Sequence, residues 1–183
     1  FELFSSPNYE DFHFQKSKKD VIKALVGHNR YATTGEKATK HAHPFQRGKI
    51  TLVHNGTLMK ESPLPDFHKF EIDSDALCNA INTLGLQGAL SLTWGAWALA
   101  FHDAQDNTMN LVRNALRPLF ICNLFPPTDW IFASEQGMMQ WLISRNYELA
   151  KEIKIQELPP QQHMKINLSS GKVTWKEIKI SAP

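Results

Sequence analysis

The chain of 183 residues is poor in cysteine, in excess charge and in long apolar runs. Its two cysteines, Cys78 and Cys122, lie inside apolar stretches, where we expect buried free thiols and not a disulfide or metal ligands. Twenty Lys and Arg against eighteen Asp and Glu give a formal net charge of +2, too little for the electrostatic footprint of a nucleic-acid-binding protein. No run of about twenty apolar residues predicts a membrane span, and no signal peptide is recognisable. The expected partners therefore include neither nucleic acid nor membrane, and the expected location is the cytoplasm.

A linker, an internal repeat and a low-complexity tract are also missing. The ten prolines and nine glycines are spread over the whole length and mark no boundary. Hydrophobic residues make up 42% of the chain, enough for the core of one ordinary domain. We therefore expect a single domain over residues 1–183.

Hydrophobic periodicity predicts more strands than helices. Helical spacing of apolar residues is found in segments 18–26, 73–84 and 135–146. Strand-like segments are 50–54, 96–101, 109–113, 119–124, 130–133, 163–168 and 173–180. Successive strands joined by short turns, with helices between them, favour an α+β fold of antiparallel sheets covered by helices over a doubly wound parallel fold.

The pair Asn55-Gly56 follows an apolar strand and has two interpretations. Asn-Gly between apolar residues is a strong hairpin signal, because both residues tolerate positive φ. Alternatively, the Asn55 side-chain amide and the Gly56 N–H could converge on a developing oxyanion, since glycine lets a substrate approach the backbone closely. The pair alone does not decide between a turn and a catalytic site.

Two charged residues also have a structural and a functional interpretation. Arg30 follows the helix stop Gly27 and lies among small and hydroxyl residues, where its guanidinium could grip a carboxylate or simply face solvent. Asp73 opens the clearest helical segment and is most simply a cap, or a neighbour of a cap at Ser74. Its alternative role is to hold an ammonium group.

Three histidines raise the question of a metal site. His41, His43 and His54 are close in sequence, but no carboxylate or cysteine completes a ligand set and His43-Pro44 is typical of a rigid turn. We therefore expect no metal and no cofactor. A Ser-His-Asp triad is not favoured either, because the chain has no Gly-x-Ser-x-Gly elbow.

Four motifs in combination are more specific than any one of them. The chain contains GHNRYAT (residues 27–33), AHP (42–44), VHNG (53–56) and DSD (73–75) in that order. Their order and spacing resemble the glutaminase domain of class II glutamine amidotransferases, and the resemblance covers roughly residues 27–135. It implies the fold of the N-terminal nucleophile hydrolases, an αββα sandwich of two antiparallel sheets between helical layers.

The resemblance implies roles for four residues. Arg30 matches the arginine that binds the α-carboxylate of glutamine, and Asp73 matches the aspartate that holds its α-ammonium. Asn55 and Gly56 match the oxyanion hole. One fixed cation and one fixed anion would position the zwitterionic end of glutamine and hold its side-chain amide ready for attack.

Further positions match residues that line the family's pocket, namely Tyr31, Thr33 and His43. Where the family often carries a Trp and a His, this chain has Tyr31 and Thr34, so the packing of the pocket is expected to differ. The implied partners are glutamine and an ammonia acceptor or synthase partner subunit.

The chain departs from the family at the nucleophile. The family uses a cysteine at the mature N-terminus whose own α-amino group acts as the base, but position 1 is Phe1. The stretch before Arg30 is shorter than in the relatives, so we expect the N-terminal hairpin to be missing and the chain as given not to hydrolyse glutamine. The favoured interpretation is an N-terminally incomplete glutaminase module. The alternative is a non-catalytic binding or structural protein on the same fold.

Overall fold

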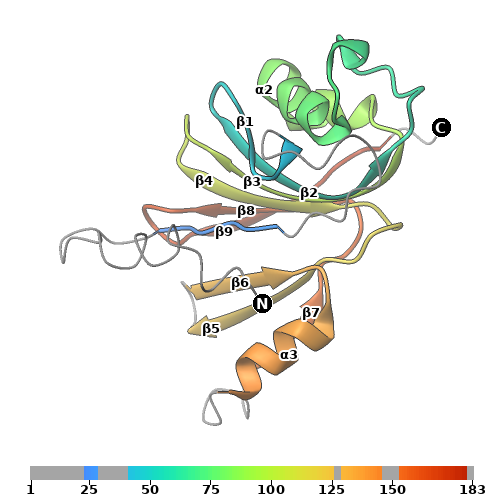
Figure 1. Ribbon diagram of the computed structural model, residues 1–183. Helices are drawn as coiled ribbons and strands as arrows, with labels where there is room; N and C mark the ends of the chain where they lie inside the picture. Colours follow the sequence, from blue (N-terminus) through green and yellow to red (C-terminus); the bar gives the residue numbers. More distant parts are fainter. Residues whose placement is uncertain (1–22, 29–40, 126–128, 146–152, 181–183) are drawn as a thin grey trace, which may run out of the picture.

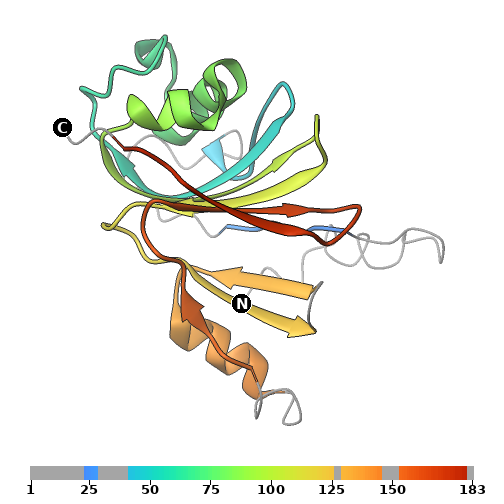
Figure 2. The ribbon, with the colours of Figure 1, turned by 180° about the vertical axis from the view of Figure 1, so that it is seen from behind.

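Four layers make up the fold, as the ribbon views show (Figure 1, Figure 2). The computed structural model describes residues 23–28, 41–125, 129–145 and 153–180. Helix α2 (Asp73–Ser91) covers a six-stranded sheet, a three-stranded sheet lies against the other face, and helix α3 (Gln136–Ser144) covers the outside of the smaller sheet. This is the helix–sheet–sheet–helix arrangement that the sequence predicted.

Both sheets are antiparallel throughout. The larger sheet has the order β1-β2-β3-β4-β8-β9, and the smaller has the order β6-β5-β7. The strands of the larger sheet are β1 (Phe45–Arg47), β2 (Ile50–Leu58), β3 (Gly95–Asp103), β4 (Thr108–Arg113), β8 (Gln162–Asn167) and β9 (Val173–Glu177). Those of the smaller sheet are β5 (Phe120–Phe125), β6 (Asp129–Ala133) and β7 (Gln156–Glu157).

Strand alternation distributes the apolar side chains between the layers. In β3, Trp97, Leu99 and Phe101 belong to the core under α2, whereas Ala98 and Ala100 belong to the core between the two sheets. Successive side chains of a strand point to opposite faces, so one apolar strand can serve two cores. A third cluster, with Cys122, Met139 and Ile143 as its buried members, lies between the smaller sheet and α3.

Helix α2 is longer than its periodicity predicted. The expected segment 73–84 continues to Ser91 across Gly85, which has φ 71° and interrupts the helical backbone. The helix resumes because Ala89 and Leu90 beyond the interruption are buried in the same core as Leu77 and Ile81. Tertiary packing thus outweighs the helix-breaking tendency of glycine.

The other expected elements are found with shifts of a few residues at their ends, with one exception. Residues 23–26, the described part of the expected helix 18–26, are not helical. Instead Val26 packs against the core between the two sheets, where the segment 23–28 is drawn in both ribbon views (Figure 1, Figure 2). The short strands β1 and β7 and the 3₁₀ turn η3 (Phe67–Lys69) were not expected. None of the described helices combines the length and the apolar character needed to cross a membrane.

Candidate functional site

The Asn55-Gly56 pair lies within β2 and not in a turn. Asn55 is paired with Ala98 and Gly56 with Trp97, and the ladder between β2 and β3 continues to Leu58 and Gly95. The hairpin interpretation is therefore wrong. The pattern misled because a turn and an irregular strand both favour a residue that tolerates positive φ.

Gly56 occupies a position that no other residue could take without rearrangement. Its φ is 152°, and a Cβ atom added there would lie 1.9 Å from the Ala96 carbonyl oxygen and 2.8 Å from His54 Nε2. The Ala96 carbonyl of β3 and the buried His54 ring therefore occupy the space that a side chain at position 56 would need. Glycine here permits a close approach between two backbones.

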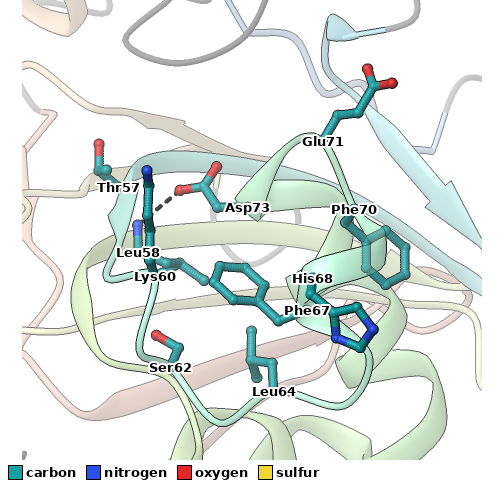
Figure 3. Close-up of a pocket in the computed structure, with 10 residues that line it drawn as sticks. All are labelled: Thr57, Leu58, Lys60, Ser62, Leu64, Phe67, His68, Phe70, Glu71 and Asp73. Carbon is teal, nitrogen blue, oxygen red and sulfur yellow. Dashed lines mark hydrogen bonds between the residues drawn. The ribbon is translucent and has the colours of Figure 1, made fainter.

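Asp73 joins the start of α2 to the end of β2. Its Oδ2 accepts a hydrogen bond of 2.8 Å from Leu58 N–H (Figure 3). Its Oδ1 accepts a hydrogen bond of 2.8 Å from Ser74 N–H. Asp73 is the first helical residue, and the N-cap is Ile72. A carboxylate in the first helical turn is also favoured by the positive end of the helix dipole. These bonds fix the carboxylate two residues beyond Gly56 and leave lone pairs for a ligand.

His54 and Ser74 form a second connection between the same two elements. His54 is 2% exposed and Ser74 is 4% exposed, and 2.8 Å separates His54 Nδ1 from Ser74 Oγ in their hydrogen bond. Burial lowers the pKa of His54 to about 4, outweighing the opposing effects of the Asp73 charge and the Ala96 backbone, while His28 and Arg117 lower it further. His54 is therefore neutral near pH 7.

A pocket of about 620 Å³ opens where β2 ends and α2 begins. Residues 59–72 connect these two elements and are called the excursion below. The pocket walls are apolar where the excursion contributes Leu64, Phe67 and Phe70, and polar at Thr57 and Asp73 (Figure 3). By strand alternation Thr57 shares a side of β2 with Asn55, whereas Asp73 approaches from the helix. The Asp73 carboxylate and Thr57 therefore line the pocket, whereas neither Asn55 nor Gly56 lines it.

Three hydrogen bonds to the main chain of Trp94 hold the base of this excursion. Met59 N–H donates to the Trp94 carbonyl at 2.9 Å, and the Ser62 hydroxyl donates to the same carbonyl at 3.1 Å. Trp94 N–H in turn donates to Ser62 Oγ at 3.1 Å. The pocket wall is therefore anchored before any ligand arrives, which lowers the entropic cost of binding.

Of the remaining predicted site residues, the structure describes only His43. Arg30, Tyr31 and Thr33 lie outside the described residues. His43 lies just before β1, with its ring centroid 4.2 Å from that of His28 and 4.8 Å from that of Phe45, and it does not line the pocket.

His41 and His54 are bonded to different side chains. His41 Nε2 lies 2.5 Å from Glu71 Oε2, whereas His54 Nδ1 is engaged by Ser74. Within the described parts of the chain, no group of three or more His, Cys, Asp or Glu side chains could hold a metal ion.

Both cysteines are unsuited to nucleophilic chemistry. Cys78 is fully buried in α2, its thiol donates to the Phe45 carbonyl at 3.5 Å, and burial raises its pKa to about 12. Burial also raises the pKa of Cys122. The thiolate is the reactive form of cysteine, so neither residue offers a nucleophile near neutral pH.

The sequence contained a signal for the His54–Ser74 pair that the prediction missed. Positions 50, 52 and 58 of β2 face the core under α2, so position 54 faces it too by alternation. A histidine in such an apolar row needs a polar partner. Ser74, in the first turn of the helix that covers this face, provides it.

Residues 28–140 match a family model described as a glutamine amidotransferase domain. The glutamine–fructose-6-phosphate aminotransferase of Bacillus subtilis (strain 168) is 32% identical and is aligned over 54% of this chain and 19% of its own length. The corresponding protein of Listeria monocytogenes is 35% identical over 47% of this chain and 17% of its own length. The chain thus spans less than a fifth of these curated relatives.

Two solved structures are similar over 84% of the chain. The glutamine phosphoribosylpyrophosphate amidotransferase of B. subtilis has a TM-score of 0.58 at 19% identity, with 34% of that chain covered. A structure described as the allosteric regulatory enzyme of purine biosynthesis has a TM-score of 0.62 at 20% identity, with 35% covered. At these identities the likeness concerns the fold alone.

Proposed function

The chain belongs to the glutamine amidotransferase domain family, and from that membership we propose that it provides the glutamine-binding part of a glutaminase. Its αββα fold is that of the N-terminal nucleophile hydrolase amidotransferases. One observation carries the proposal: Leu58 N–H holds the Asp73 carboxylate two residues beyond Gly56, on the wall of a pocket large enough for an amino acid.

In the proposed binding mode, four residues position glutamine. Asp73 accepts the α-ammonium and Arg30 binds the α-carboxylate. The Asn55 amide and the Gly56 N–H stabilise negative charge on the side-chain carbonyl oxygen during attack. Fixed donors aimed at developing charge are among the most effective catalytic devices, because they need no reorganisation during the reaction. His43, Tyr31 and Thr33 are proposed to line the same site.

The proposed reaction needs a nucleophile other than Cys78 and Cys122, because both thiols are buried and protonated. The family resemblance assigns that role to an N-terminal cysteine. With it, the module would form a glutamyl thioester, release ammonia to an acceptor or synthase partner, and return glutamate by hydrolysis. Without it, the 183 residues would form a single binding domain.

Calorimetric titration of the chain with L-glutamine tests the binding proposal. We expect Asp73→Asn to weaken glutamine binding by about 10- to 100-fold, since a hydrogen bond to a charged group contributes about 1.5–3 kcal/mol. Asp103→Asn is the matched control, because Asp103 pairs with Ile50 at the opposite end of the same two strands. Equal glutamine affinity in Asp73→Asn and in the unmodified chain would contradict the proposal.

Ammonia release distinguishes the two functions. The complete gene product is incubated with glutamine, and ammonia and glutamate are measured together. Equal amounts of both, lost on Asn55→Ala, support the glutaminase. Glutamine binding without either product supports the non-catalytic alternative.

A further inference from the structure

Two consecutive residues of α2 bind β2 on both sides of the Asn55-Gly56 pair. Ser74 Oγ is bonded to His54 Nδ1 at 2.8 Å, and Asp73 Oδ2 is bonded to Leu58 N–H at 2.8 Å. His54 and Leu58 are four positions apart on the strand, so residues 55–57 lie between two fixed points. We call His54, Ser74, Asp73 and the Leu58 N–H the clamp.

The two halves of the clamp are also bonded to each other. Asp73 Oδ1 accepts from Ser74 N–H at 2.8 Å and, more weakly, from the Ser74 hydroxyl at 3.4 Å. The His54 and Ser74 side chains are buried, where a hydrogen bond is strong and an unpaired polar group is costly. Loss of the Ser74 hydroxyl would therefore disturb both His54 and Asp73.

The His54 ring also sets the space around Gly56. A Cβ atom on Gly56 would lie 2.8 Å from His54 Nε2, so the ring occupies space that a side chain at position 56 would need. A rotation of the imidazole would therefore change the packing around Gly56. The orientation that Ser74 imposes on the ring is thus passed to the residue proposed to face the substrate carbonyl.

We infer that His54 and Ser74 are positioning residues, which hold Asn55 and Gly56 at a set distance from the Asp73 carboxylate so that both ends of glutamine are bound at once. This inference rests on the proposed glutamine site. Neither residue touches the substrate, and both act through their neighbours. A purely structural pair would contribute to stability and leave glutamine affinity unchanged.

The clamp keeps one protonation state over the physiological range. Burial lowers the pKa of His54 to about 4, with Asp73 and the Ala96 backbone opposing and with His28 and Arg117 adding to the effect. The neutral ring has one nitrogen that donates and one that accepts. Its bond to Ser74 is therefore the same at pH 6 and at pH 8, and glutamine affinity should not titrate with this histidine.

Substitutions at Ser74 test the inference. We expect Ser74→Ala to weaken glutamine binding about tenfold, the factor for losing one buried hydrogen bond, and Ser74→Thr, which keeps the hydroxyl, to restore it. Thr93→Val is the matched control, since the buried Thr93 hydroxyl bonds Ala89 O at 2.8 Å just beyond the far end of α2. This control should lower stability without changing glutamine affinity.

Nitrogen NMR of the His54 ring adds a readout that stability alone would not move. In the unmodified chain the Nδ1 resonance should stay that of a hydrogen-bonded neutral ring from pH 6 to pH 8, and Ser74→Ala should shift it while Thr93→Val leaves it in place.

The outcomes separate the inference from the function on which it rests. Failure of the unmodified chain to bind glutamine would overturn the proposed function and the inference with it. Normal binding in the unmodified chain with unchanged affinity in Ser74→Ala would overturn the inference alone.

Discussion

Replacement of Gly56 by alanine is the most direct test of the geometry at the end of β2. The new Cβ would lie 1.9 Å from the Ala96 carbonyl oxygen, which belongs to the backbone of a central strand and cannot move aside cheaply. The φ of 152° adds a backbone conformation that an L-residue rarely adopts. Overpacking costs about 1–3 kcal/mol and such a backbone position a further ~1–3 kcal/mol, so we expect a loss of about 2–6 kcal/mol.

Urea unfolding followed by tryptophan fluorescence measures this loss. With a slope of about 2 kcal/mol/M, the unfolding midpoint of Gly56→Ala should fall by about 1–3 M. Gly137→Ala is the control, because Gly137 lies in α3 with open space around its Cα and should gain about 0.5–1 kcal/mol from better helix propensity. A Gly56→Ala midpoint equal to that of the unmodified chain would refute the described contact between β2 and β3.

Two further outcomes are expected. Burial lowers the pKa of both His54 and His163 to about 4, so the unfolded state takes up these protons first as the pH falls. The stability that each neutral histidine contributes is fully present above about pH 6.5 and is lost as the pH falls towards 4. At pH 5 the loss is about 2 kcal/mol per histidine. The difference between the urea midpoints at pH 7 and pH 5 should therefore be smaller in His163→Gln than in the unmodified chain. An equal difference in both proteins would contradict this prediction. Because burial raises the pKa of Cys78 to about 12 and also that of Cys122, both thiols should react with a chromogenic thiol reagent at pH 8 only after unfolding. Rapid labelling of the folded chain would show that a thiol is accessible.

The sequence predicted the architecture well because its strands serve two cores. Alternation in β3 and the periodicity of α2 are local features of the sequence. Alternation places the apolar side chains of β3 in two cores, and periodicity places those of α2 in one. What periodicity could not supply was the continuation of α2 past Gly85 to Ser91. That continuation depends on Ala89 and Leu90 reaching a core made by strands elsewhere in the chain.

The candidate site was predictable to a smaller extent. The family resemblance singled out Asp73 beside Asn55 and Gly56, and the structure brings Asp73 to Leu58 N–H, two residues along the strand. The identity of a residue does not reveal which main-chain N–H at the end of a strand is available as a donor. The Leu58 N–H could therefore be identified as the partner of Asp73 only from the structure. The roles of Asn55 and Gly56 in an oxyanion hole, the role of Asp73 in holding an ammonium group, and the roles of Arg30, Tyr31, Thr33 and His43 stay predictions.

The attachment of the pocket wall to Trp94 has a consequence for how this domain could diversify. Because the base of the excursion is tied through Ser62 and Met59 to the main chain of Trp94, the frame does not depend on the side chains nearer its tip. Phe67 and Phe70 are only partly buried there and face the hollow. Exchanges at these two positions would reshape the chamber while the acidic anchor at Asp73 stays in place. Selection or protein engineering could thus change which ligand fits the pocket while the main-chain frame is kept.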